Sequence, residues 1–119
     1  MKKYGIDFNL MEMAELGYAL NHALGKERKH FVQIFEYNCK AIKALENIKE
    51  KMFVAMHEDS HHIELDQMEI VQLYSACNMA WHHERDEMPY QHESKIPQYR
   101  RAIQELEYAR EKILAAINS

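Results

Sequence analysis

Apolar residues recur at the spacing of an α-helix along most of the chain. The first such stripe runs from Leu10 to Leu24, and Asn9 stands three residues before Glu12 at its start. This is the spacing of a capping box, in which two side chains satisfy each other's exposed backbone N–H groups. We therefore predict a short first helix that begins after Asn9 and ends at Gly25, since glycine is the usual residue at a left-handed helix stop.

Residues 26–88 contain neither glycine nor proline and keep the helical period throughout. A single helix of this length would be too long for a compact domain, so we expect a turn in the polar run around Asp59 and Ser60, either of which is able to cap a following helix. The pattern thus predicts helices near 26–57 and 61–87, paired as an antiparallel hairpin.

Both prolines lie within residues 88–97, which we expect to form a loop before a last helix. No internal repeat is visible along the chain. Together the segments predict one all-α domain over residues 1–119. Its expected architecture is an antiparallel helical bundle built on a long helical hairpin, with a short N-terminal helix and three longer helices.

The composition and charge of the chain exclude several classes of protein. The chain is 47% hydrophobic and 29% charged, as a globular domain is, and its net charge of −4 lacks the basic balance of a nucleic-acid binder. Cys39 and Cys77 have no Cys-x-x-Cys spacing, and no stretch reaches the roughly 18 apolar residues of a membrane span. We expect a soluble, cytoplasmic protein that binds neither membrane nor nucleic acid.

The helix expected at 61–87 carries two apolar stripes. The main stripe runs from Ile63 to Trp81, and the second, on the opposite side, consists of Leu65, Met68, Gln72, Ala76 and Met79. A helix in a small bundle usually buries one stripe, so the second must meet either the N-terminal helix or another molecule. Asn38, a polar residue in the stripe of the preceding helix, either fixes the register of such an association or lies solvated at its edge.

Histidines and acidic residues are concentrated in the middle of the chain. His57-Glu58-Asp59-Ser60-His61 matches His-Glu-x-x-His and over these residues resembles the zinc site of zincin metalloproteases. The resemblance implies zinc held by His57 and His61, with Glu58 activating a water molecule. Glu58-x-x-His61 is also similar to the motif of ferritin-like di-iron bundles. Because Asp59 and Ser60 have turn character, we expect a solvated surface without a cofactor, with zinc or iron binding as the alternative.

A small basic group, Lys95, Tyr99, Arg100 and Arg101, stands at the start of the last helix and is either a solvated helix start or a site for a small anion. The chain has no phosphate-binding loop and no nucleophile triad with supporting context. We therefore expect a non-enzymatic protein that acts by protein–protein association, as a homodimer and with a protein partner. Inhibitors and adaptors, including those carried by phages, are often small helical domains of this kind. The alternatives are a metal-binding bundle and sequestration of an anionic, nucleotide-like ligand at a subunit interface.

Overall fold

The computed structural model describes residues 2–29 and 35–119, and the side chains of residues 27–38 lie outside this description. Within these ranges the chain forms, in order, β1 (Tyr4–Asp7), α1 (Leu10–Lys29), α2 (Phe35–His57), β2 (His62–Leu65), α3 (Gln67–Glu87), the 3-10 turns η1 (Met88–Tyr90) and η2 (Glu93–Lys95), and α4 (Ile96–Ile117). The predicted helical bundle is confirmed, with the addition of two short strands.

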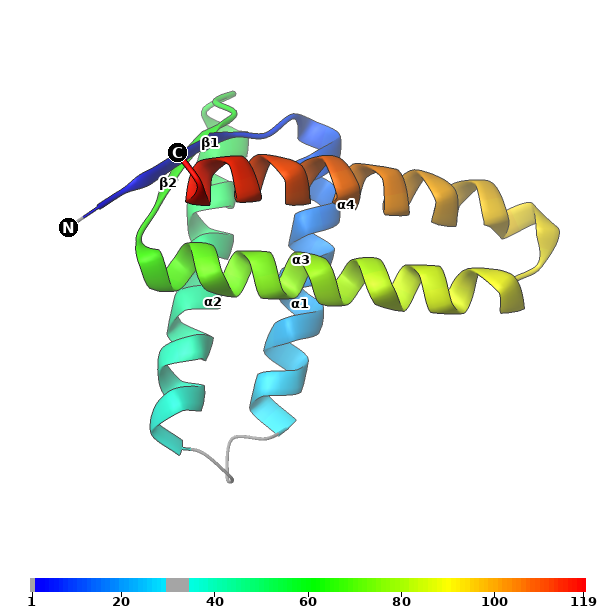
Figure 1. Ribbon diagram of the computed structural model, residues 1–119, viewed down its shortest axis with the longest axis horizontal. Coiled ribbons are helices and arrows are strands. Elements are labelled where there is room, and N and C mark those ends of the chain that lie inside the picture. Colours follow the sequence, from blue (N-terminus) through cyan, green and yellow to red (C-terminus); the bar gives the residue numbers. More distant parts are fainter. Residues whose placement is uncertain (1, 30–34) are drawn as a thin grey trace.

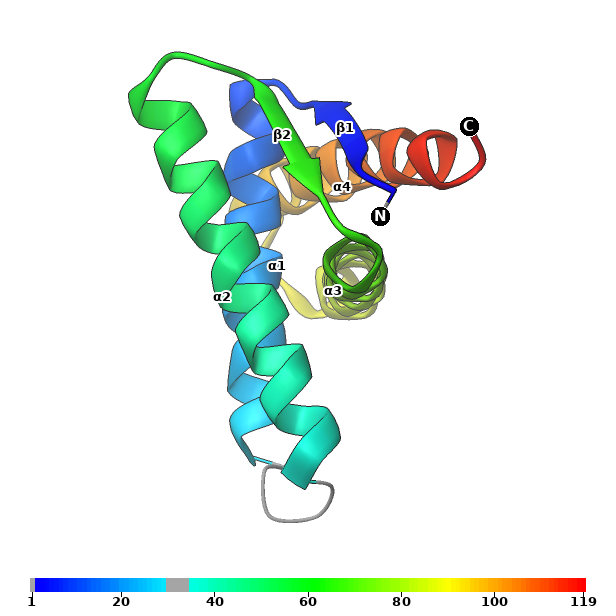
Figure 2. The ribbon, with the colours of Figure 1, turned by 90° about the vertical axis from the view of Figure 1, so that its left-hand side faces the viewer.

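The four described helices form two hairpins that cross each other. In Figure 1 the α1–α2 hairpin stands upright and the α3–α4 hairpin lies across it. Helices α1 and α3 each pack against all three of the other described helices. The strands pair antiparallel, with Tyr4 opposite Leu65 and Asp7 opposite His62. Figure 2 shows this strand pair at one end of the crossing, where β2 connects α2 to α3.

Several predicted boundaries are wrong. Helix α1 continues through Gly25 to Lys29 and is 20 residues long rather than short. A glycine inside a helix costs only about 1 kcal/mol, and nothing after Gly25 forces the helix to stop there. Residues 62–65 form a strand and not the first turn of a helix. The hairpin predicted from 26–57 and 61–87 is therefore replaced by the two hairpins α1–α2 and α3–α4.

The capping box predicted at the start of α1 is confirmed. The backbone N–H of Asn9 donates to Oε1 of Glu12, and the backbone N–H of Glu12 donates to Oδ1 of Asn9, both at 2.8 Å. The same arrangement begins α3, where Asp66 and Glu69 exchange two hydrogen bonds of 2.8 Å. Each box fixes the point at which a strand ends and a helix begins.

Both capping glutamates are buried and held by a lysine from the other hairpin. Glu12 is 1% exposed and Glu69 is 3% exposed. Lys112 of α4 donates to Oε1 of Glu12 at 2.6 Å, and Lys51 of α2 donates to Oε1 of Glu69 at 2.8 Å. Each glutamate therefore joins a helix start in one hairpin to a helix of the other.

These matching contacts reveal an internal repeat, so the expectation of no repeat is wrong. The first half, β1–α1–α2, has the same order of elements as the second half, β2–α3–α4. When residues 4–29 are aligned on 61–86 and residues 41–58 on 102–119, many aligned residues are the same. The identical pairs are Ile6/Ile63, Met11/Met68, Glu12/Glu69, Leu16/Leu73, Ala19/Ala76, Asn21/Asn78, Ala23/Ala80, Glu27/Glu84, Arg28/Arg85, Ala41/Ala102, Ile42/Ile103, Leu45/Leu106, Glu46/Glu107, Glu50/Glu111, Lys51/Lys112 and Ala55/Ala116.

The repeat also explains how the core is built. Leu16 and its equivalent Leu73 are fully buried, and so is Leu106, the equivalent of the buried Leu45. Each half therefore contributes the same helix faces to one shared core, and neither half buries its own apolar face without the other.

Candidate functional site

Most of the apolar stripe predicted as an interface lies inside this chain. Leu65, at the end of β2, is buried, and so are Gln72 and Ala76 of α3, which packs against all three other helices. Met68 and Met79 are half-buried. The sequence left two alternatives for this stripe, contact with the N-terminal helix or with another molecule, and burial within the chain agrees with the first. A partner is able to reach only the two methionines, and contact with them stays a prediction. The side chain of Asn38, in α2, lies outside the described residues.

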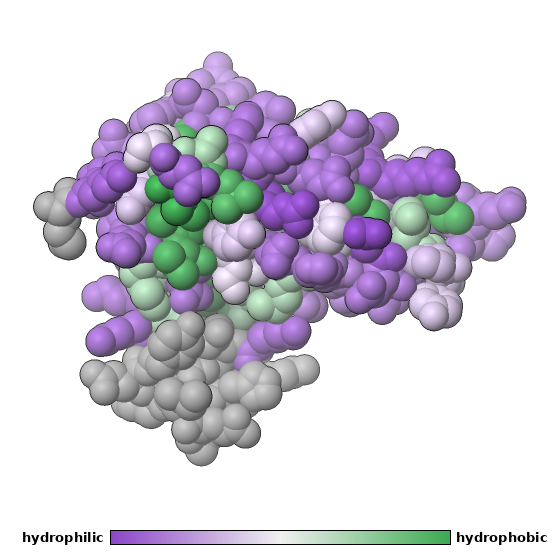
Figure 3. Space-filling view, viewed as in Figure 1, coloured by the Kyte–Doolittle hydropathy of each residue, from purple (hydrophilic) through white to green (hydrophobic). Residues whose placement is uncertain are grey.

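Each half instead exposes apolar side chains near the end of its second helix. The first patch comprises Phe53 and Met56 of α2, which are 62% and 44% exposed. The second patch comprises Leu114, which is 37% exposed, half-buried Ile117 and exposed Val71 of α3. In Figure 3 apolar side chains gather where the first turns of α3 lie beside the last turns of α4.

The two patches are related by the repeat. Phe53 aligns with Leu114, and Met56 aligns with Ile117. An exposed apolar side chain adds little to the stability of the chain that carries it, whereas its burial against another molecule contributes about 25 cal/mol per Å². Large apolar residues therefore stand at equivalent positions in both halves. Phe53, Met56 and Leu114 are exposed there, whereas Ile117 is partly packed against the core.

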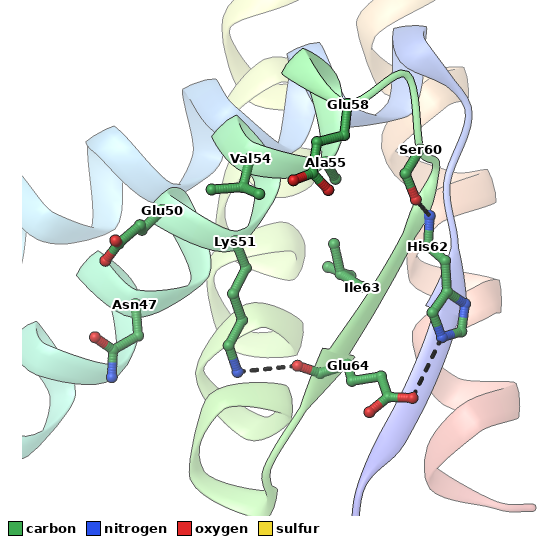
Figure 4. A pocket seen from close by; sticks show the side chains of 10 residues that line it. All are labelled: Asn47, Glu50, Lys51, Val54, Ala55, Glu58, Ser60, His62, Ile63 and Glu64. Atoms are coloured by element: carbon green, nitrogen blue, oxygen red, sulfur yellow. Dashed lines mark hydrogen bonds and ion pairs between the residues drawn. The ribbon is translucent and has the colours of Figure 1, made fainter.

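A groove separates α2 from β2, and neither Phe53 nor Met56 lines it. Its volume is about 460 Å³, and Val54, Ala55 and Ile63 supply its apolar surface. Figure 4 shows Lys51 reaching across the groove from α2, where its Nζ donates to the backbone carbonyl of Glu64 at 2.9 Å.

The rim of this groove is acidic. The carboxylates of Glu50, Glu58 and Glu64 line it. Its lysine, Lys51, is already bound to Glu69. The opening of the groove therefore carries net negative charge.

His62 lies on the exposed face of the strand pair between two carboxylates. Its Nδ1 is 2.7 Å from Oδ1 of Asp7, and its Nε2 is 3.7 Å from Oε1 of Glu64. The hydrogen bond to Asp7 is the main reason that the pKa of His62 is raised above its usual value. The ring lies over Gly5, where an added Cβ would come within 2.8 Å of its Cε1 atom. Glycine at this position therefore leaves room for the imidazole.

The His-Glu-x-x-His stretch is interrupted by a turn. Helix α2 ends at His57, the N–H of Ser60 donates to the carbonyl of Ala55 at 2.8 Å, and Asp59 has a φ of 52°. This bonding pattern with a left-handed residue is a Schellman motif. His61 lies beyond it, and its carbonyl accepts a hydrogen bond from the backbone N–H of Phe8. His57 and His61 therefore do not share a helix face.

The ring of His57 packs against its own helix. Its centroid is 4.1 Å from that of Phe53, and its Nδ1 lies 3.1 Å from the carbonyl oxygen of that residue. Both the zincin and the di-iron motifs need their ligands on successive turns of one helix, which this turn does not provide. Within residues 2–29 and 35–119, no three histidine, cysteine or acidic side chains come together as metal ligands.

The residues predicted to hold an anion are divided between two environments. Lys95, Arg100 and Arg101 are exposed. Tyr99 is half-buried and lines a cavity together with Glu15 and Glu84. Carboxylates beside the tyrosine would repel an anion, so the arrangement gives no support to a nucleotide-like ligand at Tyr99.

The two cysteines differ in their surroundings. Cys77 is buried, and its thiol donates to the carbonyl of Leu106 at 3.3 Å. Burial raises its pKa to about 12, which makes it a poor nucleophile and metal ligand. Cys39 is a half-buried free thiol.

No protein-family model, curated protein or solved structure matches this chain. Among the helices of the described ranges, none combines the length and apolar character that crossing a bilayer requires.

Proposed function

We propose that the protein is a non-enzymatic binding protein that acts by association with other proteins through the first and second patches. The observation that carries this proposal is that two exposed apolar side chains, Phe53 and Leu114, stand at equivalent positions of the two halves. Apolar surface of this kind marks interaction sites on otherwise polar proteins.

The repeat favours an adaptor among the classes of binding protein. A chain that carries the same type of surface twice is able to hold two similar partner surfaces, and linking two such contacts strengthens both. The carboxylates of Glu50 and Glu58 line the groove next to α2, the helix that carries the first patch, and favour a partner with basic side chains around its apolar contact. A second copy of this chain is the other outcome that the test below distinguishes.

The test compares single and double variants of the two patches. Phe53→Ser and Leu114→Ser remove one apolar side chain from each patch, and Tyr90→Ser is the matched control because Tyr90 is 85% exposed and lies outside both. Proteins captured from the organism that encodes the chain are quantified by mass spectrometry, and the mass of the purified chain is measured by light scattering.

We expect each patch variant to weaken capture of the same proteins, or to lower the measured mass if a second copy is the partner. The double variant should capture less of these proteins, or have a lower mass, than either single variant. Tyr90→Ser should behave as the unaltered chain. The proposal fails if the double variant keeps both its captured proteins and its mass.

A further inference from the structure

The outer edge of β2 faces the groove beside α2. The backbone N–H of Phe8 donates to the carbonyl of His61, and residue pairs along an antiparallel ladder alternate between hydrogen-bonded and non-hydrogen-bonded ones. The N–H and C=O groups of His62 and Glu64 therefore point away from β1. Lys51 of α2 donates to the carbonyl of Glu64, so this edge of β2 is turned toward α2, as Figure 4 shows.

Two backbone groups on this edge have no hydrogen-bond partner within the described ranges, the carbonyl of His62 and the N–H of Glu64. The other two are occupied, because the N–H of His62 donates to Oγ of Ser60 at 3.3 Å and the carbonyl of Glu64 accepts from Lys51. The free groups flank Ile63. In a parallel pair one residue bonds the two groups that flank its neighbour, whereas in an antiparallel pair it bonds both groups of one residue. The free groups therefore match an added strand that runs parallel to β2.

The groove along this edge combines an apolar surface with an acidic opening. Its volume of about 460 Å³ is within the range of about 300–1,000 Å³ in which proteins enclose small ligands. Val54 lines its α2 side and is 43% exposed, and the equivalent residue of the other half is the smaller Ala115. Glu50 and Glu58 also line it, and neither takes part in a salt bridge of the described residues. The groove is therefore complementary to an apolar segment with basic neighbours.

We propose that this groove binds an extended basic segment of another protein, which adds to β2 as a parallel strand. Free strand edges bind extended peptides through backbone hydrogen bonds, and alternate side chains give specificity. The peptide residue beside Ile63 shares the buried face of the sheet and should be apolar, whereas its neighbours share the exposed face with Glu64 and should be basic. The inference does not depend on the two patches, because neither Phe53 nor Met56 lines the groove.

A second copy of this chain fits the edge less well. Two copies related by a two-fold axis would pair the same strand with itself antiparallel, which the free groups do not match. Helix α2 also lies along the edge, and Lys51 joins it to β2 across the groove (Figure 2). The space between α2 and β2 therefore admits a single extended chain more readily than a folded domain.

The test uses capped peptides and the ¹⁵N-labelled full chain at low ionic strength, where charge attraction is least screened. The probe is the pentapeptide Val-Lys-Val-Lys-Val. One control peptide has glutamate in place of both lysines, and another carries a methyl group on the nitrogen of its central valine, which removes the N–H that would donate to His62. Amide shifts report where each peptide binds, and hydrogen exchange reports whether the N–H of Glu64 becomes bonded.

We expect the lysine peptide to shift the amides of residues 62–64, with a dissociation constant on the order of 1 mM, and to slow exchange at Glu64. The N-methylated peptide should bind about tenfold more weakly, because it loses one backbone hydrogen bond and its methyl group obstructs strand pairing. The glutamate peptide should bind more weakly still, because the acidic opening repels it.

The proposal is overturned if the lysine peptide leaves residues 62–64 unchanged, or if either control peptide binds as tightly. Protection of the Glu64 amide that rises with protein concentration in the absence of peptide would also overturn it, since a second copy would then cover the edge.

A pair of variants locates the binding in the groove. Val54→Lys places a longer, positively charged side chain on the α2 side and should weaken binding of the lysine peptide by about tenfold. Because Val54 is exposed, the melting temperature should not change. Ala115→Lys is the matched control, since it makes the same charge change at the equivalent exposed position of α4 and should bind the peptide as the unaltered chain does. Equal binding by the two variants would place the peptide elsewhere and contradict the proposal.

Discussion

The ion pairs between the two lysines and the buried capping glutamates allow a specific prediction about the free energy of unfolding. Lys112→Met keeps the aliphatic part of the side chain but removes the charge that holds Glu12. The carboxylate of Glu12 then stays buried without its ion-pair partner. Glu12→Gln removes the charge from the buried side instead and leaves the Lys112 ammonium, whose side chain is 41% exposed, free to be solvated. The two substitutions break the same contact but leave different groups behind.

The burial of the two side chains determines which substitution destabilises the protein more, and by how much. Breaking a fully buried pair costs about 3–5 kcal/mol, and the partial exposure of Lys112 reduces this to about 2–3 kcal/mol for Lys112→Met. Glu12→Gln should cost about 1 kcal/mol, because glutamine still accepts the hydrogen bond of the capping box. The double variant should be more stable than Lys112→Met alone, since no unpaired buried charge remains.

Urea unfolding followed by circular dichroism measures these differences. A loss of about 2–3 kcal/mol corresponds to a fall of roughly 1–2 M in the urea midpoint of a small domain. Lys95→Met serves as the control, because Lys95 is exposed and should change stability by less than about 0.5 kcal/mol. The reasoning is refuted if Lys112→Met costs no more than Glu12→Gln. The repeat offers an independent trial, because Lys51→Met and Glu69→Gln should show the same order.

Three further predictions concern single groups. Asp59→Gly should raise stability to thermal unfolding by about 1 kcal/mol, because the left-handed conformation strains any residue with a Cβ; no gain would contradict the assigned turn. His62, titrated by NMR, should show a pKa above 6.5 that falls towards 6.5 in Asp7→Asn; the stability that this ion pair adds is then present at low pH and lost as pH rises through the folded-state pKa. In the native protein a thiol reagent should modify Cys39 before Cys77, whose pKa is about 12, and equal rates would show that Cys77 is accessible.

The parts of the fold that depend on local sequence could be predicted. Helical periodicity indicated the helices, and the spacing of Asn9 and Glu12 located the start of α1 correctly. The same spacing occurs at Asp66 and Glu69, so the sequence also contains the signal for the start of α3, which the expectation of a cap at Asp59 or Ser60 missed.

The strand pair depends on contacts between distant segments. Residues 62–65 alternate between exposed and buried positions, but four residues are too few to distinguish a strand from a helical turn. Their partner, β1, lies more than 50 residues earlier in the chain, so no local sequence pattern indicates the pairing. The period of the sequence alone therefore favoured a helix.

The outcome for the candidate interface depended on how the helices pack against one another. The sequence shows two apolar stripes on α3, but not that α1 and α2 cover one of them, because that burial results from the crossing of two hairpins. The repeat could have been predicted from the sequence, since Leu45-Glu46 recurs as Leu106-Glu107 and Glu50-Lys51 as Glu111-Lys112. Aligning the two halves places the apolar residues Phe53 and Leu114 at equivalent positions.

Association through the repeat-related patches is tested most directly by hydrogen–deuterium exchange of the chain alone and in complex with a captured partner. The account predicts slower exchange in the complex at residues 53–57 or 114–118, with little change around Tyr90. Slower exchange confined to other surfaces, with both of these segments unchanged, would contradict it.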